Sequence, residues 1–200
     1  MADTNVITTK ERILRSAARM FSERGYDKVT TREIAKEIGI NSATIYHHFS
    51  SKDDILKTLY KFYSEQRRKE YPDLQELLLL AETEPPHSVL MRSVFHFKEE
   101  MRGLLDQILV TATRMICIDE ESEHFIRENI FNSIADMLKP LLKRMVELGK
   151  LEPFDIDTFV GVMTYYCFSA ATLNNSPFQQ DVVKYQAGMS YIFSMITPIE

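Results

Sequence analysis

Apolar residues recur every three to four positions along most of the chain, which is the period of an amphipathic helix. The first run extends from about Thr9 to Arg24, with Thr8 and Glu11 placed as a capping box and Gly25 as its end. No stretch keeps a period-two alternation bounded by turns. The pattern therefore predicts an all-α fold of nine to ten helices.

Residues 30–49 predict two short helices joined by a turn at Gly39. Thr30 can cap the first helix and Asn41 the second, which extends from Ser42 to Phe49. The outward face of the second helix has no carboxylate; it holds Ser42, Ala43, Thr44, Tyr46, His47 and His48. A small N-terminal end and flanking donors are what a helix needs in the major groove. The pair is interpreted as a helix-turn-helix, with an ordinary helical corner as the alternative.

This region also resembles a known family. The matching residues are Thr30, Ile34-Ala35, Gly39-Ile40-Asn41, Ile45-Tyr46-His47-His48-Phe49-Ser50-Ser51-Lys52-Asp53-Asp54-Ile55-Leu56 and, upstream, Ile13-Leu14, Ala17, Phe21 and Gly25-Tyr26. In order and spacing they resemble the signature of the TetR family of bacterial transcriptional regulators, over roughly residues 9 to 60. Asn41 departs from the Ser or Thr more usual there, but all three cap helices. The resemblance implies a non-enzymatic regulator, most often a repressor, whose body senses a small molecule.

The DNA-facing residues are predicted from the helix face and the resemblance together. The partner expected is a double-stranded, pseudo-palindromic operator. Base edges would be met by Ser42, Ala43 and Thr44, and phosphates by Tyr46, His47, Thr31, Arg32 and Lys52.

The domain organisation follows from breaks in the helical pattern. We expect a DNA-binding head over 1–50, a connecting helix over 51–71 that Pro72 ends, and a ligand-binding and dimerisation body over 72–200. Within the body, Leu77–Leu80 is apolar nearly all round and should be buried. A break near Gly103 and a kink at Pro140 are also expected.

Charge is distributed unevenly along the 200 residues. The net charge of −5 argues against a protein that coats nucleic acid, but the first 70 residues carry an excess of Lys and Arg and the remainder an excess of Asp and Glu. A basic head on an acidic body fits a DNA reader joined to a module that does not bind DNA.

The last two predicted helices carry apolar residues on more than one face. One stripe holds Phe159, Met163, Tyr166 and Ala170, with Val160, Thr164 and Phe168 around the rest; the other helix presents Val182, Tyr185, Met189, Ile192, Phe193 and Ile196. A monomer buries one stripe, so we expect a homodimer through these two helices, as the resemblance also implies. The alternative is that both helices are core.

An effector pocket is predicted where polar groups interrupt the apolar body helices. The candidates for its walls and polar groups are Phe95, His96, Arg114, Met115, Phe125, Met163 and Tyr166. Mainly apolar walls with few polar groups predict a small, mostly hydrophobic effector. Each of these residues taken alone has a core role as its alternative.

Enzyme and metal chemistry have little support, and no cofactor or metal is expected. The sequence has no Gly-rich phosphate loop, no Gly-x-Ser-x-Gly and no His-Glu-x-x-His. Cys117 and Cys167 are interpreted as core residues rather than a disulfide. With no membrane span or signal core, we expect a cytoplasmic protein. Two other functions stay open: an enzyme or ligand-storage protein with the helix-turn-helix as a packing corner, and a protein-interaction module.

Overall fold

The computed structural model describes residues 7–94, 99–173 and 182–196, and the elements in these ranges are all helical. The prediction of an all-α fold is confirmed. With the continuous run α8–η2–α9 taken as one, the described residues form ten α-helices plus one 3-10 turn. The elements are α1 (Thr9–Arg24), η1 (Tyr26–Lys28), α2 (Thr31–Glu37), α3 (Ser42–His48), α4 (Lys52–Glu70), α5 (Leu74–Thr83), α6 (Pro86–Val94), α7 (Glu99–Met115), α8 (Glu120–Ile126), η2 (Arg127–Asn132), α9 (Ser133–Glu147), α10 (Ile156–Leu173) and α11 (Val182–Ser194).

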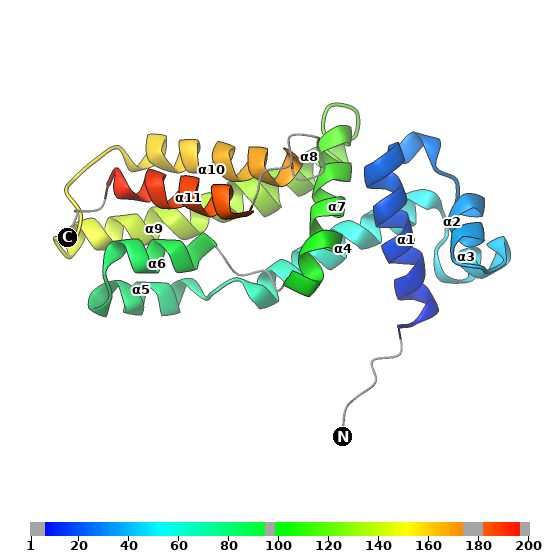
Figure 1. Ribbon diagram of the computed structural model, residues 1–200, viewed down its shortest axis with the longest axis horizontal. Helices are drawn as coiled ribbons and strands as arrows, with labels where there is room; N and C mark the ends of the chain where they lie inside the picture. The colour runs from blue at the N-terminus through cyan, green and yellow to red at the C-terminus, as the bar shows by residue number, and fades with distance from the viewer. Residues whose placement is uncertain (1–6, 95–98, 174–181, 197–200) are drawn as a thin grey trace, which may run out of the picture.

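The molecule is elongated, with a small head at one end and a helical bundle at the other (Figure 1). The head consists of α1, α2 and α3; the bundle contains α5, α6, α9, α10 and α11. Helix α4 extends from the head toward the bundle, and α7 crosses α4 and packs beside α1. Helices α4 and α7 therefore join the body to the head.

The helix starts in the head are fixed by side-chain caps, as the sequence predicts. The hydroxyls of Thr8 and Thr30 each accept a backbone hydrogen bond at 3.2 Å, and both capping boxes are complete. The Asn41 side chain accepts from the Ala43 backbone at 3.0 Å. Gly39 turns the chain with a φ of 70°, a conformation that costs glycine least.

An aromatic cluster joins α4 to α8 at the boundary between head and body. The Tyr60 ring stacks on Phe125 with centroids 4.3 Å apart, and Tyr63 meets the same ring edge-on at 5.2 Å. The Tyr60 hydroxyl lies 2.7 Å from Ser122 Oγ. Burial raises the pKa of Tyr60 above its usual value, so the phenol stays protonated at neutral pH. We call Tyr60, Tyr63, Ser122 and Phe125 the junction cluster.

Several local expectations for the body are wrong. Leu79 is 67% exposed although Leu77 is fully buried, because neighbouring helices cover only one side of α5. Gly103 lies inside α7 and does not end a helix. Cys117 is exposed rather than part of the core. Pro140 lies inside α9, and the kink expected there stays a prediction; the π-helical segment η2 lies upstream in the same run.

The junction cluster predicts a large cost for losing the Phe125 ring. Phe125 is 4% exposed, so Phe125→Ala leaves a cavity between α4 and α8 and should lower the free energy of unfolding by about 3–5 kcal/mol. Urea unfolding followed by circular dichroism measures this. Ile118→Ala is the control, since Ile118 is 72% exposed in the same region and should change stability by less than about 0.5 kcal/mol. Equal effects of the two substitutions would contradict the packing described.

Candidate nucleic-acid interface

Helix α3 presents one face to the exterior and buries the other. Ala43, Tyr46 and His47 are exposed, at spacings of three and four that place them on one side of a helix. Ile45 is fully buried on the opposite side. Ser42 and Thr44 are partly exposed at the N-terminal end, and α3 contains no Asp or Glu. The exposed face thus offers hydroxyl, phenol and imidazole groups without negative charge.

Tyr46 is held in place by helix α2. Its hydroxyl lies 3.1 Å from Thr31 Oγ1, while its side chain remains 57% exposed. Thr31 itself is only 9% exposed, so its hydroxyl is placed to orient Tyr46 more than to meet a large partner directly. Arg32, the next residue, is fully accessible at the same edge.

Lys52 begins α4 and is folded back onto η1. Its Nζ donates to the Tyr26 carbonyl at 3.0 Å and lies 4.0 Å from the centroid of the Tyr26 ring. Neither partner is anionic, so these contacts do not pair the ammonium with a carboxylate at the helix start, where the dipole is also positive. Burial, followed by the nearby Asp53 carboxylate, raises the pKa of Tyr26 to about 12.

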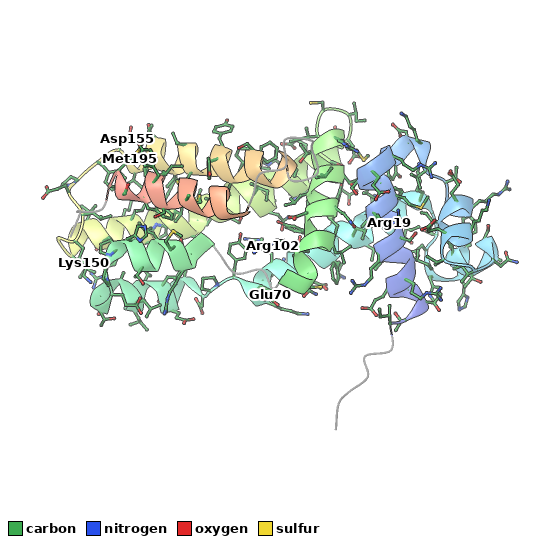
Figure 2. All side chains as sticks on the ribbon, viewed as in Figure 1. Arg19, Glu70, Arg102, Lys150, Asp155 and Met195 are labelled. Atoms are coloured by element: carbon green, nitrogen blue, oxygen red, sulfur yellow. The ribbon has the colours of Figure 1, made fainter. Side chains whose placement is uncertain are left out.

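Three carboxylates of α1 and α2 form ion pairs with arginines of α1. Arg19, labelled in Figure 2, bridges Glu23 at 3.0 Å and Glu37 at 2.5 Å. Arg24 lies 2.6 Å from Glu33. The hydrogen bond from Arg24, together with those from Thr30, lowers the pKa of Glu33 to about 2. The pairing reduces the negative potential that these acids would otherwise add to the head.

Lys10 and Arg12 are both exposed near the start of α1, and the structure separates their roles. Arg12 donates to the Ile38 carbonyl, so it ties α1 to the helix-turn-helix turn. Lys10 stays exposed with its Nζ 5.6 Å from the Phe49 ring centroid, at the end of α3. Lys10 is therefore an additional cation beside α3 whose position depends on a tertiary contact that no local pattern reveals.

The predicted effector residues are distributed over several body helices. Met115, Phe125 and Met163 are buried on α7, α8 and α10. Tyr166 is partly buried on α10, and its hydroxyl lies against Gly188 of α11, where a Cβ would meet it at 2.0 Å. Phe95 and His96 lie outside the described residues.

Arg114 lies where α7 meets the end of α1. It is exposed on α7, and its guanidinium donates to the Ser22 carbonyl at the end of α1. Its interaction therefore joins head to body, a role that depends on the packing of two distant helices.

Two kinds of site are missing from the part of the chain that the structure describes. No group of three or more His, Cys, Asp or Glu side chains is placed to hold a metal ion in those ranges. Within the same ranges, no helix has both the length and the apolar character needed to cross a bilayer.

Comparisons with known proteins place these features in context. Residues 13–59 match the family model described as bacterial regulatory proteins, tetR family. Over 140 residues the chain is 26% identical to the biofilm operon icaADBC negative transcriptional regulator IcaR of Staphylococcus aureus, covering 69% of this chain and 68% of that protein. It is 32% identical over 114 residues to the uncharacterised transcriptional regulator YerO of Bacillus subtilis, covering 57% of this chain but only 38% of YerO.

Solved structures share the whole fold. The ketosteroid transcriptional regulator KstR2 of Mycobacterium tuberculosis superimposes with a TM-score of 0.69 and 22% identity, over 97% of both chains. A TetR-family transcriptional regulator from Agrobacterium tumefaciens gives a TM-score of 0.68 and 20% identity, over 94% of this chain and 97% of the other. At these identities the likeness is one of fold alone.

The Arg24–Glu33 pair predicts how the head responds to acid. Because Glu33 has a lower pKa in the folded head than the usual 4.5, its ionisation stabilises the fold above pH 4.5, and this contribution is lost as pH falls toward about 2. Glu33→Gln keeps an acceptor for the capping box but not the charge. The melting temperature of this variant should be below that of the natural protein at pH 6, and the difference should shrink between pH 4.5 and 2. Glu65→Gln, at an exposed position on α4, is the control and should show no such change.

Proposed function

Because this chain belongs to the TetR family of bacterial regulatory proteins, we propose that it is a cytoplasmic repressor of transcription released from its operator by a small molecule. The observation that carries the proposal is the outward face of α3, which is free of carboxylates and begins with small residues at its N-terminal end. Cations at Lys10, Arg32 and Lys52 flank it. A surface of this kind suits the base edges and phosphates of a duplex.

The proposed contacts divide into those that read sequence and those that set register. Ser42, Ala43 and Thr44 occupy the N-terminal end of α3, the part of a recognition helix that reaches base edges. Tyr46, which Thr31 orients, would contact phosphates. His47, Arg32 and Lys52 would also contact phosphates, as their exposure and charge suggest. The head, residues 1–50, would thus carry the DNA-binding function.

A homodimer would place two such heads on one duplex. Large apolar side chains are exposed on and just after the last two helices: Val162 and Tyr165 on α10 are 53% and 67% exposed, Tyr191 on α11 is 66% exposed, and Met195, directly after α11, is 64% exposed. Burying these residues against a second copy removes apolar surface from water. The twofold axis would then require an operator with two half-sites about one helical turn apart, or a multiple of one turn.

Effector release would act through the connecting helix, residues 51–71. Helix α4 in this segment packs on α1 and α7, and its Tyr60 and Tyr63 contact Phe125 of α8. An effector held among the body helices 72–200 would shift α4 and change the separation of the two heads. The effector can shift the equilibrium between the two head separations only by as much as it binds one of them more tightly than the other. The proposed effector site includes Met115, Met163 and Tyr166, and excludes Arg114 because that side chain bonds to Ser22.

The proposed function is tested by selecting bound fragments from the genome of the source bacterium. We expect the purified protein to recover fragments that share one short pseudo-palindrome. Recovery of fragments without a shared sequence, at a salt concentration where non-specific binding is weak, would contradict the proposal.

The division of α3 contacts predicts different effects at neighbouring positions. Tyr46→Ala removes a phosphate donor and should weaken binding to all duplexes about 3- to 10-fold. Ala43→Gln should instead change which half-site is preferred. Binding isotherms at fixed salt on the selected operator and on a panel of single-base variants measure both. A uniform loss with Ala43→Gln, or a change of preference with Tyr46→Ala, would reverse the assignment.

The proposed dimer face predicts that one exposed apolar position matters and another does not. Tyr165→Glu places a charge in the interface and should weaken dimerisation at least about tenfold, with loss of operator affinity. Leu79→Glu is the matched control, because Leu79 is also 67% exposed but lies on α5. Sedimentation equilibrium distinguishes them. A monomer produced by Leu79→Glu, or a dimer unaffected by Tyr165→Glu, would place the interface elsewhere.

A further inference from the structure

Arg67, near the end of α4, is partly buried, and one of its N–H donors has no acceptor in the described part of the chain. Its Nε is buried and has no hydrogen-bond partner, and no ion pair to its guanidinium is found within those residues. The guanidinium carbon lies over the Tyr71 ring, 5.4 Å from its centroid, which is a cation–π contact. Buried guanidinium donors are costly when left unpaired, so this arrangement calls for an acceptor.

Arg67 lies on the side of α4 that faces the body. Tyr63, Arg67 and Tyr71 follow one another at intervals of four residues and therefore share one side of the helix. Tyr63 is 2% exposed, and it contacts Phe125 of the junction cluster. Arg67 thus lies on the same stripe as the aromatic contact that links α4 to α8.

Other elements bring further groups to this end of α4. Figure 2 labels Glu70 on α4 and Arg102 on α7 where the end of α4 passes the start of α7. Asp106 is one turn after Arg102, and its charge acts on Tyr63; Cys167 of α10 is close enough to act on Tyr71. Glu70 and Asp106 each have other interactions, and neither forms an ion pair with Arg67 among the described residues. Charged groups of α4 and α7 therefore lie near this end of α4, while the Nε of Arg67 has no acceptor in the described residues.

We propose that Arg67 binds the carboxylate of an anionic effector whose apolar part packs against the body helices. The proposal rests on the effector-responsive function above and specifies the chemical class of the effector. A guanidinium offers a planar pair of donors that matches a carboxylate, and the tyrosines beside it suit an apolar or aromatic remainder. Because Arg67 belongs to α4, the bound anion would act on the helix that carries the head.

The test compares acids with amides of the same shape. Octanoate and 3-phenylpropanoate are each added to the natural protein, with octanamide and 3-phenylpropanamide as neutral counterparts, and the melting temperature is followed. At least one acid should raise the melting temperature, by mass action on the folded state, while its amide does not. Stabilisation by amides equal to that by acids, or no stabilisation by either acid, would overturn the proposal.

Two substitutions locate the effect at Arg67. Arg67→Gln should weaken binding of the stabilising acid about 10- to 100-fold, whereas Arg68→Gln, at the adjacent exposed arginine, should leave it unchanged. Without any acid, Arg67→Met should melt no lower than Arg68→Met, since it removes an uncompensated buried group. An equal loss of acid binding in both Gln variants, or a destabilised Arg67→Met, would show that Arg67 has a structural role instead.

Operator binding separates this inference from the function on which it rests. Both Gln variants should bind the selected operator as the natural protein does, but the stabilising acid should release only the natural protein and Arg68→Gln. Operator binding that no acid releases would refute the anionic effector and leave the DNA-binding function intact. Failure of the natural protein to bind any operator would refute the function itself.

Discussion

The stacking of Tyr60 and Tyr63 on Phe125 is the contact on which the relation between head and body depends. One α8 ring touches two α4 side chains, at 4.3 and 5.2 Å, and all three are buried. Packed aromatic interiors change by discrete rearrangement more readily than by gradual deformation. A displacement of the bundle would therefore move α4 as a rigid helix. The hydrogen bond between Tyr60 and Ser122 fixes the register of α4 relative to α8.

The head is built so that a small hydrophobic centre supports a charged exterior. Ile34 and Ile45 are fully buried between α2 and α3, and the arginines of α1 pair with the nearby acids. These pairs are exposed and contribute little to stability, but they decide which charges a duplex would meet. The positive groups left around α3 are held by neutral contacts, as Lys52 is by Tyr26. The match of residues 13–59 to the tetR family model and this arrangement of charges support the proposed DNA-binding function through separate arguments.

Local chemistry explains what could be predicted from the sequence. Caps at Thr8, Thr30 and Asn41 and the turn at Gly39 involve neighbours within four residues, so the head helices and the family resemblance were identified correctly. Contacts between distant residues could not be identified in this way. The exposure of Leu79 depends on which helices cover α5, and the bond of Arg114 to Ser22 depends on how α7 crosses α1. Arg67 was missed because an unpaired guanidinium has no sequence pattern. The roles of the α3 residues and of the effector candidates stay predictions.

The π-helical segment η2 sets a requirement on chain length in the body. It follows Phe125, which packs against α4, and contains Phe131, whose ring meets Tyr165 and Phe168 of α10. A π-turn holds one residue more than an α-turn, and each residue of an α-helix turns the chain by about 100°. Removing one residue here would let the helix become regular, but it would rotate everything that follows away from its partners. Related proteins can therefore vary the side chains of this segment more freely than they can vary its number of residues.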